Sequence, residues 1–211
     1  MIELTNINFK NILHYPTIKI VEGETTFITG PSGSGKSTLL KLINGTVDAN
    51  EGSISLNGIK IEDYNRIELR RDYILCDQSV YLYEQSVRDN FHSFYNLREE
   101  SLLTDSQINN FLELSCSSAH LDDSVISMSG GERQRIYIAI CLSLARKAIM
   151  FDEPTSALDD LTADTLLKNM KTYCTQNHLD LIIVSHNSTL SEKYADHLVL
   201  ISNLKEDDAH E

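Results

Sequence analysis

A glycine-rich segment at residues 30–38 has residue types and spacing suited to binding phosphate. Glycines let successive backbone N–H groups turn inward around an anion, and a helix that begins here would add its dipole. We expect Lys36 to reach the β- and γ-phosphates of a nucleotide and the Ser37 hydroxyl to ligate Mg²⁺. The alternative is a surface turn rich in glycine and serine. The segment satisfies the pattern G-x-x-x-x-G-K-[ST] with the residues Gly30, Pro31, Ser32, Gly33, Ser34, Gly35, Lys36, Ser37 and Thr38.

Two adjacent carboxylates, Asp152 and Glu153, follow directly on the apolar run 148–151. Carboxylates at the end of a buried strand are costly unless they are paired. A metal ion and a water molecule would remove that cost. We therefore expect Asp152 to hold Mg²⁺ through water and Glu153 to polarise a water for attack on the γ-phosphate. The alternative is an acidic turn after a strand.

A third segment, residues 129–132, precedes a long stretch with helical periodicity. Ser129 and Glu132 have the spacing of a capping box, which by itself explains why a helix begins here. It does not explain the two glycines, Gly130 and Gly131, between them. Glycines at this place allow backbone amides to approach a phosphate closely.

The elements that must position these residues alternate along the chain. The sequence predicts strands at residues 2–9, 25–29, 53–56, 73–76, 148–151, 181–185 and 197–201. Several of these are short apolar runs bounded by turn residues, which suits strands buried on both faces. Amphipathic periodicity predicts helices at 36–44, 87–92, 105–116, 131–145, 161–176 and 188–194. Strands that alternate with helices indicate an α/β fold. The stretch from about 86 to 127 has helical patterns alone and is interpreted as a helical insertion.

Composition excludes several classes of protein. The chain has 211 residues, a hydrophobic fraction of 41% and a formal net charge of −13, which disfavours a nucleic-acid partner. No stretch has the length and apolarity of a membrane helix, and residues 1–6 lack the features of a signal peptide. The four cysteines form no C-x-x-C pair, so we expect no disulfides or zinc site and a cytoplasmic location.

The order of these motifs resembles the ATP-binding cassette (ABC) ATPases over essentially the whole chain. The P-loop at 30–38 is followed by a Q-loop glutamine, Gln78, a signature at 129–132, a Walker B strand at 148–153, a D-loop at 156–159 and a switch histidine, His186. The resemblance implies a P-loop NTPase fold with a mostly parallel RecA-like core sheet, an antiparallel β subdomain and an inserted helical subdomain. It implies one ABC ATPase domain over 1–211, with the ATP-binding core lobe at 1–85 and 128–211 and the helical subdomain at about 86–127.

The resemblance also implies a mechanism. Two subunits pair head to tail around two ATP molecules, and Ser129, Gly130, Gly131 and Glu132 of one subunit contact the nucleotide on the other. Gln78 senses Mg²⁺ and the attacking water, and Asp159 acts across the interface. His186 contacts the γ-phosphate and orients the water, although a lone histidine after a strand is more often structural. The expected catalytic residues are thus Glu153, His186, Gln78 and Lys36, and the expected ligands of Mg²⁺ are Ser37, Gln78 and Asp152.

The chain departs from the family where many members carry an aromatic residue that stacks on adenine. That position falls on Asn11 here, and Phe9 is expected to pack inward. Tyr15 is a candidate substitute. The signature is preceded by Met128 rather than Leu and has Glu132 where Gln is commoner, which we expect to leave activity intact.

The function that the resemblance implies is ATP binding and hydrolysis to energise a membrane transporter. The permease would lie on a separate chain, the second ATPase subunit would be another copy, and the location would be the cytoplasmic face of the membrane. An exporter, with iron or another metal as cargo, is one expectation; a soluble ABC ATPase without a transport role is the alternative. Tyr81, Tyr83 and Phe91 are interpreted either as lining a groove for the permease or as a local core. The acidic stretch 205–211 is expected to be solvated.

Overall fold

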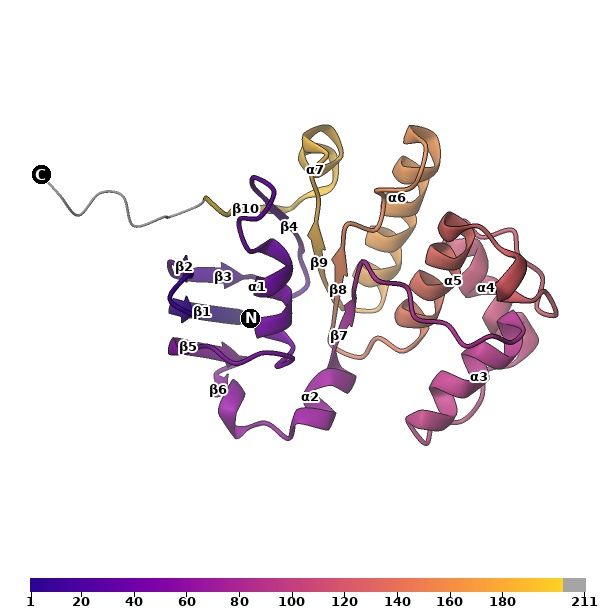
Figure 1. Cartoon of the computed structure of the whole chain (residues 1–211), viewed down its shortest axis with the longest axis horizontal. Helices are drawn as coiled ribbons and strands as arrows, with labels where there is room; N and C mark the ends of the chain where they lie inside the picture. The colour runs from indigo at the N-terminus through magenta and orange to yellow at the C-terminus, as the bar shows by residue number, and fades with distance from the viewer. Residues whose placement is uncertain (203–211) are drawn as a thin grey trace, which may run out of the picture.

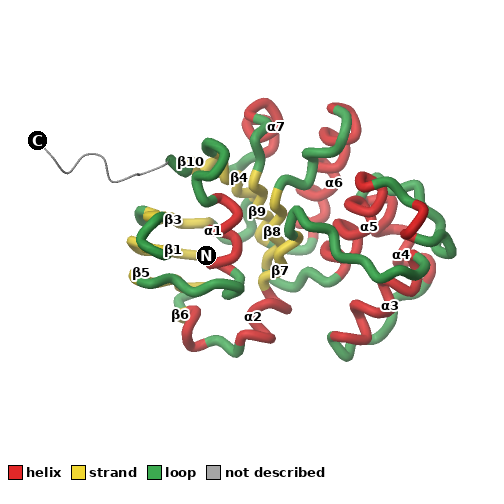
Figure 2. Tube along the Cα trace, in the orientation of Figure 1, coloured by secondary structure: helices red, strands yellow, loops and turns green. Residues whose placement is uncertain are grey.

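The computed structural model describes residues 1–202 and contains two five-stranded sheets with helices around them (Figures 1 and 2). The strands are β1 (Ile2–Phe9), β2 (Leu13–Tyr15), β3 (Ile18–Ile20), β4 (Thr25–Thr29), β5 (Glu51–Leu56), β6 (Ile59–Lys60), β7 (Tyr73–Cys76), β8 (Ala148–Asp152), β9 (Asp180–Val184) and β10 (His197–Leu200). The α-helices are α1 (Lys36–Ile43), α2 (Arg66–Asp72), α3 (Val87–Leu97), α4 (Asp105–Leu114), α5 (Gly130–Ser143), α6 (Asp160–Gln176) and α7 (Ser188–Tyr194), with 3₁₀ turns η1 (Ile61–Asp63) and η2 (Val125–Ser127).

The parallel sheet does more than the antiparallel sheet to position the site. Its strand order is β10-β4-β9-β8-β7. Every neighbouring pair in it is parallel. Both faces of its central strands are buried, as β8 illustrates: Ile149 and Phe151 belong to one hydrophobic core, Ala148 and Met150 to the other. The continuous apolar runs of the sequence therefore correspond to strands covered on both sides. The predicted α/β class is confirmed.

The antiparallel sheet has the order β2-β1-β5-β6, and β3 also pairs with β1. Helix α1 lies between this sheet and the parallel one (Figure 1), since its buried residues Leu39, Leu40, Leu42 and Ile43 share a core with β1 and β8. The predicted antiparallel β part is confirmed. The sequence did not predict β2, β3, β6 or α2, all of which are short.

The opposite face of the parallel sheet is covered by α5 and α6, and α3 and α4 pack beside α5. Residues 86–127, predicted as a helical insertion, hold α3, α4 and η2. Arg88 of α3 forms an ion pair with Asp105 at the start of α4. The division into a core lobe and a helical subdomain stays a prediction, because nothing observed separates the two as units.

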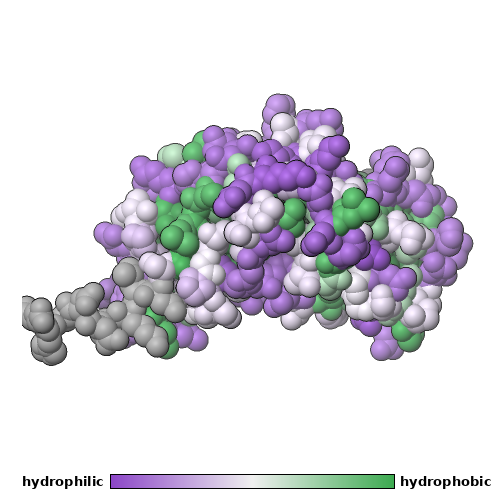
Figure 3. Space-filling view, turned by 90° about the horizontal axis from the view of Figure 1, so that it is seen from above, coloured by the Kyte–Doolittle hydropathy of each residue, from purple (hydrophilic) through white to green (hydrophobic). Residues whose placement is uncertain are grey.

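The surface is polar over most of the face seen in Figure 3, where hydrophobic residues form small separate patches. Within residues 1–202, no helix has both the length and the apolarity to span a membrane. All four cysteines have free thiols. The predicted solvated stretch 205–211 lies outside the described residues.

Candidate active site

The phosphate-binding segment connects the carboxyl end of β4 to the first turn of α1. Gly35 immediately precedes the helix in a left-handed conformation, with φ of 94°. Gly30 has φ of 149°, and a Cβ atom there would collide with the backbone oxygen of Ile201 just after β10. A Cβ atom at Gly35 would collide with the Tyr15 hydroxyl and the Leu13 side chain, so a side chain fits at neither position. Pro31, Ser32 and Gly33 at its tip are exposed.

Lys36 is the buried cation of this loop. Its side chain is 5% exposed, and Nζ donates to the carbonyl oxygens of Gly30 at 2.9 Å and Pro31 at 2.8 Å. Burial lowers the pKa of Lys36, while the carboxylates of Glu153 and Asp152 act in the opposite direction. An ammonium group has three donors, so one remains for an anion. The Ser34 hydroxyl is buried and lacks a hydrogen-bond partner among the described residues. The loop thus fits a phosphate group.

Asp152 ends β8 beside this loop and is 5% exposed. Burial raises the pKa of its carboxyl group; the nearby Ser37 side chain acts to lower it. Residues 1–202 hold no cluster of three or more His, Cys, Asp and Glu side chains suited to a metal ion. The donor set present, a carboxylate and a hydroxyl, fits Mg²⁺, which takes few protein oxygens and completes its shell with water and phosphate.

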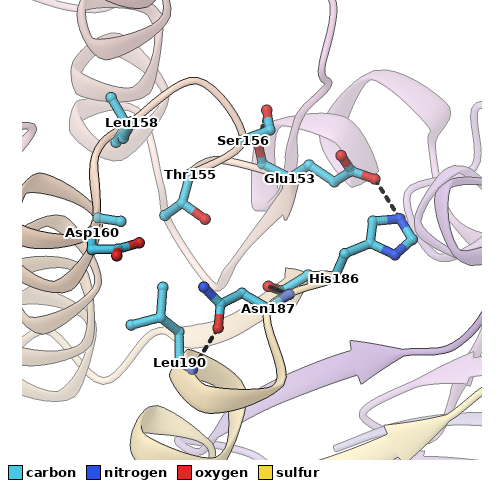
Figure 4. Close-up of a pocket in the computed structure, with 10 residues that line it drawn as sticks. Glu153, Thr155, Ser156, Leu158, Asp160, His186, Asn187 and Leu190 are labelled. Atoms are coloured by element: carbon cyan, nitrogen blue, oxygen red, sulfur yellow. Dashed lines mark hydrogen bonds and ion pairs between the residues drawn. The ribbon is translucent and has the colours of Figure 1, made fainter.

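Glu153 and His186 contact each other at the same edge of the sheet (Figure 4), with 2.9 Å between Glu153 Oε1 and His186 Nε2. The two side chains come from the loops after β8 and β9, which are neighbouring strands. Glu153 is 24% exposed and His186 45% exposed, so both can reach a bound molecule. Glu153 also has φ of 53°, which is uncommon for a residue with a side chain. Its N–H donates to the Val184 carbonyl at 3.1 Å.

The signature segment begins α5, and the capping box predicted there is confirmed. The Ser129 N–H and hydroxyl donate to Glu132 Oε2 at 2.8 and 2.6 Å, and the Glu132 N–H donates to the Ser129 hydroxyl at 3.3 Å. These bonds lower the pKa of the Glu132 carboxyl group. Ser129 and Gly130 are exposed. Helices α1 and α5 pack on opposite faces of the parallel sheet, so the P-loop and the signature start from different sides.

Two further predicted residues lie at the ends of elements. Gln78 is exposed and follows β7, next to Asp77, whose carboxylate pairs with Lys41 of α1 at 2.9 Å. Asp159 caps α6 by accepting from the Thr162 N–H at 3.0 Å and from its hydroxyl at 2.7 Å. Capping accounts for Asp159 within one chain, and any role across an interface stays a prediction.

Tyr15 is not an adenine platform, and that hypothesis is wrong. Its side chain is 2% exposed, and its hydroxyl donates to the Gly35 carbonyl at 2.8 Å. Burial raises the pKa of the Tyr15 hydroxyl well above its ordinary value. The ring supports the phosphate loop from behind, where no base can stack. Asn11, at the position usual for the aromatic residue, is exposed on the β1–β2 turn.

The three aromatic residues after β7 do not act as one cluster. Phe91 is completely buried in the core, whereas Tyr81 is 59% exposed. Tyr83 lies between Tyr81 and Phe94, with ring centroids 5.4 and 6.0 Å away. The local-core interpretation therefore holds for Phe91, and Tyr81 is left free on the surface.

Comparison with known proteins settles the family. The model of the family described as "ABC transporter" matches residues 13–156, which include the P-loop, the signature segment and Glu153. The chain belongs to the ABC transporter family. It has the fold of an ATP-binding cassette, and the expectation of an ABC ATPase is confirmed at the level of the family.

The relatives that match this cassette include proteins of similar length and much longer proteins. It is 31% identical to the "Probable ABC transporter ATP-binding protein PEB1C" of Campylobacter jejuni over 96% of its own length and 87% of the relative. It is 32% identical to the "Multidrug resistance-like ATP-binding protein MdlA" of Buchnera aphidicola over 93% of its length, but it spans only 37% of that protein. The dimeric structure of MJ0796, described as a bacterial ABC transporter cassette, matches with a TM-score of 0.84 and 25% identity, covering 96% of this chain and 95% of that one.

The sequence did not identify Gln134 as part of the site. Its Nε2 donates to the Glu153 carbonyl at 3.5 Å, from the second turn of α5. The residue lies next to the signature segment, but a glutamine in an amphipathic helix carries no signal of such a contact. The left-handed backbone conformation of Glu153 could not be predicted from the sequence either, because it depends on the packing around the residue.

Proposed function

We propose that this cassette binds ATP with Mg²⁺ at the carboxyl edge of its parallel sheet and hydrolyses it. The observation that carries the proposal is the arrangement of strands β4, β9 and β8, which are neighbours in the sheet. The P-loop follows β4, His186 follows β9, Asp152 ends β8 and Glu153 follows it. Ligands of open α/β sheets bind at this edge, outside the carboxyl ends of the strands.

The phosphates of ATP would be held by residues 30–38. Lys36 would neutralise the β- and γ-phosphates, and backbone N–H groups of the loop together with the start of α1 would bind their oxygens. Ser37, Asp152 and Gln78 would hold Mg²⁺ directly or through water. When bound, Mg²⁺ neutralises charge that develops on the phosphate oxygens.

Hydrolysis requires one proton transfer, and the Glu153–His186 pair is arranged for it. Glu153 would accept a proton from a water molecule whose oxygen attacks the γ-phosphorus; the bond from that phosphorus to the oxygen of ADP breaks. His186 would orient the Glu153 carboxylate and the γ-phosphate. Lys36 would stabilise the charge on the transferring phosphoryl group.

A second copy of the chain would complete the site. Within one chain the P-loop and the signature start from opposite faces of the parallel sheet. A signature can therefore cap a nucleotide most simply in trans, and the exposed Ser129 and Gly130 are available for that contact. The γ-phosphate would bridge the two subunits, and its loss on hydrolysis would remove the contacts that favour the closed pair. Asp159 would lie at the same interface.

The dimer would act on a membrane permease encoded on another chain, at the cytoplasmic face of the membrane. Support comes from the relatives, which are named as ATP-binding proteins of ABC transporters. The exposed Tyr81 after β7 provides an aromatic contact for such a partner. The direction of transport and a metal or iron cargo stay predictions, because the names of the relatives differ: one is named for multidrug resistance and another for glutamine transport.

The experiment is a comparison of ATP turnover between the wild-type chain and Lys36→Ala at saturating MgATP. We expect turnover in the wild type and a loss of about 100- to 1,000-fold in the variant, the usual cost of removing a group that stabilises the transition state. Lys60→Ala is the matched control, since Lys60 is an exposed lysine on β6. Equal turnover by Lys36→Ala and the control would refute the assignment of the P-loop.

A further inference from the structure

The backbone of Glu153 is held by three different parts of the chain. Its N–H donates to Val184 of β9 at 3.1 Å, and its carbonyl accepts from the Ser156 N–H at 3.3 Å and the Ser156 hydroxyl at 3.1 Å. The third partner is Gln134 of α5, at 3.5 Å. A left-handed conformation at a residue with a side chain persists when surrounding contacts fix it. The position of the Glu153 carboxylate therefore depends on these partners.

Gln134 differs from the other partners because it belongs to the helix that begins with the signature. Gly130 starts α5, and Ser129 caps it. The capping box closes the first turn, and Ile136, Ile138 and Ile140 anchor the following turns in the core. A helix fixed in this way moves as a unit, so a shift of the signature end also moves Gln134.

The bond from Gln134 is long, at the outer limit for an N–H donor to a carbonyl oxygen. A small movement of α5 toward Glu153 would strengthen the contact, and a movement away would break it.

From this geometry we propose that Gln134 is a positioning residue that couples the two nucleotide sites of the dimer. It rests on the proposed function, in which the signature of each subunit caps the nucleotide of its partner. When the signature binds the partner's γ-phosphate, α5 shifts and Gln134 sets the Glu153 backbone of its own subunit. Each subunit thereby becomes competent for hydrolysis only after its signature has bound the nucleotide of the partner subunit.

The test compares Gln134→Met, which keeps the length of the side chain but has no donor, with Ser156→Ala. Ser156→Ala removes the other side-chain donor to the same carbonyl, but from the loop after Glu153 rather than from α5. Turnover is measured against ATP concentration for each variant. The nucleotide affinity and the thermal midpoint of each variant are also measured. They serve as controls for an intact P-loop and an intact fold.

We expect the wild type to show a Hill coefficient above 1 and approaching about 2, the number of sites. Gln134→Met should lower kcat about 10- to 100-fold, the range for a small misplacement of a reacting group, and bring the Hill coefficient to about 1. Ser156→Ala should lower kcat and keep the cooperativity. Gln134→Lys, which keeps a donor on a long side chain, should restore part of both.

Three results would overturn the coupling. They are a wild-type Hill coefficient of 1, wild-type behaviour of Gln134→Met, and a loss of kcat in Gln134→Met with cooperativity as high as in Ser156→Ala. The last result would make Gln134 a local support only. A wild-type chain that fails to hydrolyse MgATP would instead count against the proposed function.

Discussion

At the scale of single residues, the charged groups of the site are held in place by neutral neighbours. Lys36 donates to two loop carbonyls, and Tyr15 fixes a third carbonyl, that of Gly35. These three hydrogen bonds fix the shape of the loop. A preformed set of donors costs little reorganisation when charge develops in the reaction.

Tyr15→Phe tests whether this tyrosine is a support or a base platform. Removal of the hydroxyl leaves the Gly35 carbonyl without that donor, so we expect a loss of about 1 kcal/mol and roughly 2–4 °C in the thermal midpoint. The preference for ATP over GTP should be unchanged, because the ring does not meet the base. An unchanged midpoint together with an altered base preference would contradict this role.

Most of the residues that lie together at this site are predictable from the sequence, because they sit in fixed order on the ends of strands. The P-loop follows β4 and the acidic pair ends β8, as the apolar runs before them indicate. Tyr15 and Gln134 could not be predicted in the same way. Burial of Tyr15 and the reach of Gln134 to Glu153 are properties of the packed chain, and no local pattern encodes them.

At the scale of elements, the strands with apolar runs were the most predictable part of the fold. β1, β4 and β7 have the predicted bounds, and α7 does too. β2 and β3 are three residues each and are formed by pairing with β1, so their own sequences carry little signal. Helix α2 buries only Leu69 and exposes Ile67 at 63%, so it has no apolar stripe.

The start of β9 offers a test of stability against pH. Burial raises the pKa of the Asp180 carboxyl group above its ordinary value, although the Gly23 N–H bonded to it at 2.6 Å acts in the opposite direction. A carboxyl group with a raised pKa in the folded state stabilises the fold fully below its unfolded pKa. That contribution is lost as pH rises through the pKa of the folded state. The ionised Asp180 therefore lowers the free energy of unfolding at neutral pH.

Asp180→Asn keeps an acceptor for the Gly23 N–H and removes the titration. We expect the variant to have a higher thermal midpoint than the wild type at pH 7. The advantage should shrink as pH falls toward the ordinary range of a carboxyl group. Asp63→Asn, at an exposed carboxylate, is the control. A midpoint advantage that grows as pH falls would contradict the sign.

At the scale of the whole molecule, the proposed dimer would bring together the P-loop of one chain and the signature of another. The P-loop and the signature are attached to helices on opposite faces of the parallel sheet, and Ser129 and Gly130 are exposed. The chain also carries a net charge of −13, so two copies repel at long range. In the proposed dimer, specific contacts would have to overcome this repulsion, and the γ-phosphates bound between the subunits would supply them.

The most direct test of this account is the mass of Glu153→Gln in solution, measured by light scattering with and without MgATP. The amide cannot accept the proton of the attacking water, so ATP should remain intact and hold the subunits together. We predict a monomer without nucleotide and a doubled mass with MgATP, and a monomer under both conditions when Lys36→Ala is added. A Glu153→Gln chain that stays monomeric at saturating MgATP would contradict the nucleotide-bridged dimer.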